Sequence, residues 1–234
     1  MNSPAPAEKV FDLALTTVRE LNQSLHRREE TAAGGRWLVT NPRGAHAIAC
    51  GIRAPVEVRI EGHAGYYCAG MNQEATVIVD GNAGVGVAEN MMSGTVHIKG
   101  SASQSAGATG HGGLLVIDGD AGARCGISMK GVDIVVKGSI GHLSPNMAQA
   151  GTLVVCGNAG PALGDSLYEA KIFVRGRVAD LGADCVEREA TAGEREALGK
   201  LLQRAGVAHP PAEFRLYASA RKLYRFHVDH AGSY

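Results

Sequence analysis

The stretch TVIVDGNAGVGVAENMMSGTVHIKG, residues 76–100, contains two copies of one short pattern: four strand-favouring residues, a charged residue and a glycine. The same glycine returns every 19 residues from residue 62 to residue 176. A fixed period over this many copies is typical of stacked structural repeats, in which each copy packs against its neighbours. The seven repeat glycines are Gly62, Gly81, Gly100, Gly119, Gly138, Gly157 and Gly176.

Two aliphatic positions stand four and two residues before each repeat glycine. Residues two apart on a strand share a face, so both positions should point into the stack and form two continuous ladders. The first ladder is Val58, Val77, Val96, Leu115, Ile134, Leu153 and Ile172, and the second is Ile60, Val79, Ile98, Ile117, Val136, Val155 and Val174. The pattern predicts a mainly β protein, a parallel β-helix of about seven turns.

The position between the two ladders should point out of the stack, yet five of its seven members are apolar. These members are Ile78, Val116, Val135, Val154 and Phe173. Contiguous apolar surface usually marks a contact. We therefore expect this column to be covered, either by a terminal helix of the same chain or by another subunit.

The residue directly before the repeat glycine alternates in sign at Asp80, Lys99, Asp118 and Lys137. Neighbouring strands lie about 4.8 Å apart, so these side chains form one stripe, and a solvated charge ladder is favoured over a metal or acid/base site. The following GNAG and GDAG sequences are typical of turns, in which glycine adopts positive φ. A phosphate-binding loop is disfavoured because such loops precede a helix.

Composition excludes several classes of protein. The chain has 234 residues, with 23 basic and 23 acidic side chains, so nothing favours a nucleic-acid or membrane partner. We expect neither a membrane span nor a secretory signal. The five cysteines include no CxxC pair, which favours reduced thiols in a cytoplasmic protein. The histidines share no metal-like spacing, and no catalytic motif is present, so we expect no catalytic, cofactor-binding or metal-ligating residue.

The ends of the chain differ from its middle. Helical spacing over residues 7–28 predicts an amphipathic helix that caps the first coil or docks to a partner. Thr191 and Glu194 predict a capping box at the start of a second helix, and Gly206 predicts where that helix ends. The aromatic, basic tail, with Tyr217 and Tyr224, packs back on the stack or inserts into another subunit.

The repeats resemble a known family. GHAGYYCAGMNQEATVIVDGNAGVGVAENMMSGTVHIKG and SIGHLSPNMAQAGTLVVCGNAGPALGDSLYEAKIFVRG are similar to the GXGXG domain of the glutamate synthase large chain. That resemblance implies a right-handed β-helix over residues 45–186, with an N-terminal helical segment over 1–44 and a C-terminal helix and tail over 187–234. A left-handed hexapeptide helix is disfavoured because 19 is not a multiple of six.

The segments LGADCVEREA and ASARKLYRF resemble the separate GXGXG subunit of N-methylglutamate synthase. The resemblance implies a non-catalytic subunit that joins an amidotransferase-like chain to a synthase chain carrying FMN and iron–sulfur clusters. That complex converts glutamate and methylamine to N-methylglutamate and ammonia. The alternatives are the small structural subunit of a formylmethanofuran dehydrogenase complex and a free-standing β-helix enzyme. A joining role favours a partner interface at the apolar outward column, Tyr217 and Tyr224.

Overall fold

The computed structural model describes residues 8–32 and 34–221. Its strands belong to one sheet with the order β1-β2-β3-β4-β5-β6-β7-β8-β9-β11-β10. The strands are β1 (Glu8–Asp12), β2 (Arg36–Thr40), β3 (Glu57–Ile60), β4 (Thr76–Val79), β5 (Thr95–Ile98), β6 (Leu114–Ile117), β7 (Lys130–Val136), β8 (Ala150–Val155), β9 (Lys171–Val174), β10 (Cys185–Arg188) and β11 (Arg215–Ser219). The helices are α1 (Val18–His26), α2 (Arg28–Thr31), α3 (Ala192–Arg204) and a short 3-10 turn at Pro211–Glu213.

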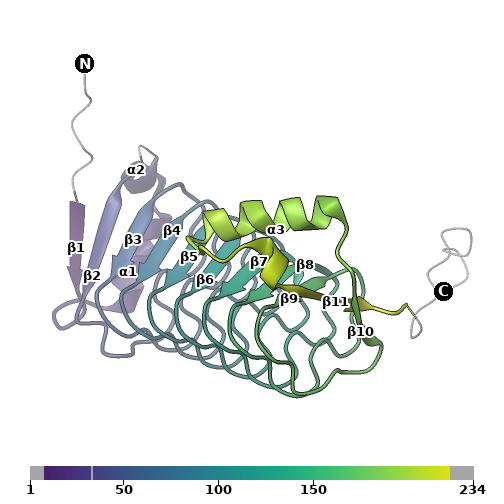
Figure 1. Cartoon of the computed structure of the whole chain (residues 1–234). Helices are drawn as coiled ribbons and strands as arrows, with labels where there is room; N and C mark the ends of the chain where they lie inside the picture. The colour runs from purple at the N-terminus through teal and green to yellow at the C-terminus, as the bar shows by residue number, and fades with distance from the viewer. Residues whose placement is uncertain (1–7, 33, 222–234) are drawn as a thin grey trace, which may run out of the picture.

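The chain winds into a parallel β-helix, with one sheet strand in each coil (Figure 1). Strands β3 to β9 pair in parallel, and each residue lies opposite the one 19 positions later, as in Val58 with Val77 and Val77 with Val96. A second line of parallel bridges runs along another side of the coils, from Ala64 to Val178. The predicted mainly β fold of about seven stacked turns is therefore confirmed.

The two predicted ladders form the core. Every side chain from Val58 to Ile172 in the first ladder, and from Ile60 to Val174 in the second, is fully buried. The small residues of the second bridge line, such as Ala83 and Ala121, close the interior from the other side. Burial of apolar area at roughly 25 cal/mol per Å² makes these stacked columns the main source of stability.

The repeat glycines are required for a different reason from the one expected. Among the seven, Gly62 alone has positive φ. At Gly157 a Cβ atom would stand 2.6 Å from the carbonyl carbon and oxygen of Gly138 on the preceding coil. Close approach between coils, rather than left-handed backbone, therefore excludes a side chain, and the turn explanation based on positive φ is corrected.

The polar position after each glycine links the coils by hydrogen bonds. The Asn82 side-chain Oδ1 accepts from the Ser101 backbone N–H at 2.9 Å, and Asp120 Oδ1 accepts from Ser139 N–H at 2.7 Å. The same contact, 19 residues apart, recurs up to Arg177, whose N–H donates to Asn158 at 2.8 Å. These bonds satisfy backbone donors at the corner and fix the register of each coil.

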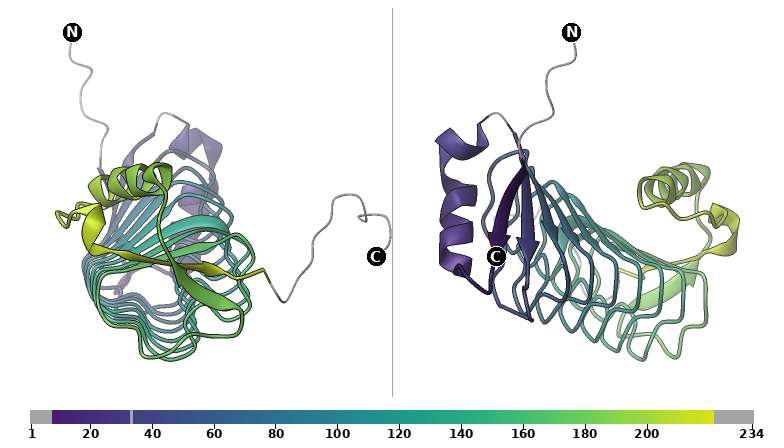
Figure 2. Two further views of the ribbon diagram at one scale, coloured as in Figure 1. Left: turned by 45° about the vertical axis from the view of Figure 1, so that its right-hand side comes forward. Right: turned by 90° about the vertical axis from the view of Figure 1, so that its left-hand side faces the viewer.

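The N-terminal cap is partly strand. Residues Glu8–Asp12 form β1, which pairs in parallel with β2, so the helix predicted over residues 7–28 is wrong for this part. Helix α1 begins after the Thr17 cap, whose side chain accepts from Glu20 N–H, and its buried Leu21 and Leu25 pack on the core. The helix therefore covers the end of the stack, as the capping alternative expected (Figure 2).

The C-terminal segment returns over the sheet. The Thr191–Glu194 capping box is present, and Gly206 with φ of 65° follows the end of α3, so both predictions are confirmed. Strand β11 then inserts antiparallel between β9 and β10. Figures 1 and 2 show α3 lying across the outer face of the sheet. Within residues 8–32 and 34–221, no helix has the length and hydropathy needed to cross a bilayer.

Candidate interaction surfaces

Helix α3 covers the apolar outward column of strands β6 to β9. Val116, Val135, Val154 and Phe173 are between 0% and 3% exposed. They form one cluster with residues of α3 and of the segment that follows it: Leu198, Leu201, Leu202, Ala205, Phe214 and Leu216. The helix and the sheet thus bury each other's apolar faces.

The expectation that another subunit contacts this column is wrong for these four residues. The open alternative, a terminal helix of the same chain, is what the structure shows, because α3 already removes them from water. Ile78 lies outside that cluster and is half-buried. Tyr217 is buried in β11, and Tyr224 lies outside the described residues.

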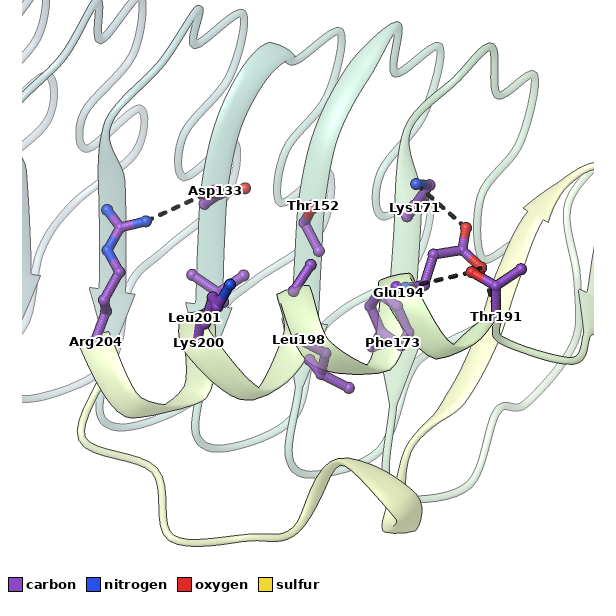
Figure 3. A pocket seen from close by; sticks show the side chains of 12 residues that line it. Asp133, Thr152, Lys171, Phe173, Thr191, Glu194, Leu198, Lys200, Leu201 and Arg204 are labelled. Atoms are coloured by element: carbon purple, nitrogen blue, oxygen red, sulfur yellow. Dashed lines mark hydrogen bonds and ion pairs between the residues drawn. The ribbon is translucent and has the colours of Figure 1, made fainter.

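A groove of about 540 Å³ runs between α3 and strands β7 to β9 (Figure 3). Phe173, Leu198 and Leu201 line its middle, and each of them is at most 5% exposed. Its two ends are charged, with Lys171 and Glu194 at one end and Asp133 and Arg204 at the other. The repeat pattern did not predict this groove. The position five residues before the repeat glycine supplies Asp133, Thr152 and Lys171 to it, but the same position is also polar in coils outside the groove, at Glu57, Thr76 and Thr95.

Glu194 is the most heavily bonded acid at the groove. Its carboxylate accepts from Arg188 Nη2 at 2.6 Å, from Arg188 Nη1 at 3.0 Å and from Thr191 N–H at 2.9 Å, and Lys171 Nζ lies 3.2 Å away. The hydrogen bonds from Arg188 are the largest effect, and they hold the pKa of Glu194 well below its usual range. The carboxylate therefore anchors the start of α3 and is ionised at neutral pH.

Asp133 marks the opposite end of the groove. Burial raises its pKa, while Arg204, 3.7 Å away, and hydrogen bonds from Thr152 act in the other direction. Asp133 and Arg204 are thus paired at this end of the groove, while Lys200 pairs with Glu196 at 2.7 Å outside it. The acids at the two ends of the groove are therefore paired with basic side chains, which does not favour proton transfer there.

The charge stripe has the predicted character. Lys137 Nζ lies 2.8 Å and Lys99 Nζ lies 3.8 Å from the Asp118 carboxylate, so the alternating ladder is confirmed from Lys99 to Lys137. Asp80, the first member of the stripe, pairs with Arg59 at 2.6 Å. His97 Nε2 joins the Asp118 carboxylate at 2.9 Å. Partial burial raises the pKa of Asp118, but the bonds from Lys137 and His97 outweigh it and leave the pKa below its usual value.

The five thiols are unsuited to nucleophilic chemistry. Burial raises the pKa of Cys50 to about 11 and those of Cys125 and Cys185 to about 12, and it also raises those of Cys68 and Cys156. At neutral pH such thiols are protonated and poorly reactive. In the part of the chain that the structure describes, no group of three or more His, Cys, Asp or Glu side chains is placed to hold a metal ion.

Comparison with known proteins gives a family. No protein-family model matches the chain. The chain is 59% identical over 226 residues to the protein GlxC of Rhizobium meliloti (strain 1021), a match that covers 96% of this chain and 99% of GlxC. The chain belongs to the GlxC family. Because the match leaves out few residues, likeness to GlxC extends beyond the repeats into the terminal segments that form the cap and α3.

Proposed function

We propose that this GlxC-family chain is a non-catalytic structural subunit of a glutamate-synthase-like complex. Its role is to hold an amidotransferase-like chain and a synthase chain in one particle. FMN and iron–sulfur clusters belong to the synthase chain in this proposal. The reaction of the complex is the conversion of glutamate and methylamine to N-methylglutamate and ammonia.

The observation that carries the proposal is the parallel β-helix built from the GXGXG repeats. The resemblance of those repeats to the glutamate synthase domain implies this fold, and the coils pack in register over the whole repeated region. Coil-to-coil hydrogen bonds and fully buried aliphatic ladders make an elongated rigid body. Such a body suits a part that holds other subunits at fixed separation.

Reconstitution with the two partner chains tests this function. N-methylglutamate formation from glutamate and methylamine should require all three chains, and the flavin absorbance should purify with the synthase chain. Stoichiometric flavin or iron on the purified GlxC-family chain would refute the scaffold role. Assembly with molybdopterin-binding and formyltransferase chains instead would assign the scaffold to a formyl-transfer complex.

A further inference from the structure

A second cavity lies at the N-terminal cap, away from the groove beneath α3. It has a volume of about 740 Å³ and lies between α1, α2 and the loop over residues 51–55. Figure 2 shows these two helices beside the first strands of the sheet. A cavity of this size is within the range that binds small molecules or the side chains of a docked peptide.

The cavity is cationic. Arg28 of α2 and Arg53 of the loop line it, together with His26, and none of its lining residues is acidic. Within residues 8–32 and 34–221, neither arginine forms an ion pair. Of the two acids of α2, Glu30 is already engaged, with Lys9 Nζ at 2.9 Å and Arg27 Nη1 at 3.0 Å, and Glu29 is exposed and does not line the cavity. Two exposed guanidinium groups are therefore free to bind carboxylates in the bidentate geometry that arginine favours.

One wall of the cavity is apolar, and a further exposed methionine lies on the next coil. Leu25, Pro55 and Met71 line the cavity, and Met71 is 45% exposed. Met92, 44% exposed, does not line the cavity but lies on the next coil, where its N–H donates at 2.9 Å to the backbone oxygen of Asn72, the residue after Met71. Methionine side chains adapt to varied partner surfaces, and exposed ones are common at protein-binding sites.

We propose that this surface, defined as Arg28, Arg53, Met71 and Met92, docks an acidic segment of a partner subunit. One or two carboxylates of the segment bind the arginines, and an apolar side chain next to them packs on the methionines. A small free anion would satisfy the arginines but leave both methionines exposed to water. The combined charge and apolar surface therefore favours a protein segment, and the inference rests on the proposed joining function.

The test measures the affinity of the folded chain for its co-expressed partner chains. The double variant Arg28→Glu/Arg53→Glu should lose affinity about tenfold or more, because attraction becomes repulsion. Arg28→Lys/Arg53→Lys keeps the charge and should stay within a few-fold of wild type. Arg177→Glu is the matched control, since Arg177 is exposed on the last coil and lines neither cavity. Circular dichroism confirms that each variant is folded.

The outcomes separate the two proposals. Wild-type assembly with unchanged affinity in the double variant overturns this docking site and leaves the joining function intact. Failure of the wild-type chain to assemble with either partner overturns both. Titration of the wild-type chain with inorganic phosphate or succinate tests whether the cavity binds a small free anion instead of a protein segment. The docking proposal is overturned if Arg28→Glu/Arg53→Glu abolishes binding of the small anion but leaves the affinity for the partner chains unchanged. The cavity would then be a small-anion site.

Discussion

Replacing Gly157 with alanine tests whether close approach between coils explains the repeat glycines. Gly157 N–H donates to Gly138 O at 2.8 Å, so the two coils are in direct backbone contact at this corner. The added Cβ would stand 2.6 Å from Gly138 C and O and from Ser139 Oγ, whereas ordinary contact begins at about 3.4 Å. The coils must separate locally by several tenths of an ångström to admit the methyl group.

The cost follows from overpacking. Extra methyl groups forced into a close-packed site typically cost about 1–3 kcal/mol. For a chain of this size each kcal/mol lowers the melting temperature by about 2–4 °C. The Gly157→Ala variant should therefore melt about 2–12 °C below wild type.

The control is Gly193→Ala in the first turn of α3. A Cβ at Gly193 meets nothing within 4 Å, and alanine is favoured in helices by about 0.5–1 kcal/mol. This variant should melt at or slightly above the wild-type temperature. Thermal unfolding followed by far-ultraviolet circular dichroism measures both. Equal melting temperatures for Gly157→Ala and wild type would refute the close-approach explanation.

Three further predictions concern the helix contact, acid stability and the thiols. Leu198→Ala should cost about 2–5 kcal/mol by leaving a cavity beneath α3, and limited proteolysis should then cut within that helix before the coils. Ser24, Lys9 and Arg27 lower the pKa of Glu30 to about 2, so its stabilising effect is complete above the unfolded pKa near 4.5 and is lost as pH falls toward 2. The melting-temperature difference between wild type and Glu30→Gln should accordingly be largest at pH 7 and shrink through that range; a constant difference would contradict the assignment. Ellman's reagent should label none of the five cysteines rapidly in the native chain at pH 8 and all of them in urea, and a fast-reacting native thiol would show that burial does not control these groups.

The core was predictable because a fixed period assigns every residue to a face. Val77 and Val79 repeat with the same neighbours in each coil, so a local pattern determined their burial without knowledge of the rest of the chain. Local pattern failed at β1, where apolar residues at helical spacing continue from α1 into Glu8–Asp12. There the pairing of β1 with β2 provides backbone hydrogen bonds that outweigh a weak helical preference.

Long-range contacts explain the other differences between the structure and the predictions made from the sequence. The sequence contains an apolar outward column and an amphipathic C-terminal helix, but nothing local says that one covers the other. That packing places Leu198 in one buried cluster with Val154, and β11 pairs Leu216 with Phe173, which is far away in the sequence. The groove and the cationic cavity both arise from such non-local packing, so neither could be predicted from spacing alone. Likewise, a glycine in the sequence does not show whether a positive φ or a close approach between neighbouring coils requires it.

Native mass spectrometry of the co-expressed chains tests the joining role most directly. The amidotransferase-like and synthase chains are purified with and without the GlxC-family chain, under the same conditions. The account predicts one particle that contains all three chains, and separate partner chains when the GlxC-family chain is omitted. A stable particle of the two partner chains alone, with the mass and activity of the full preparation, would contradict the central claim.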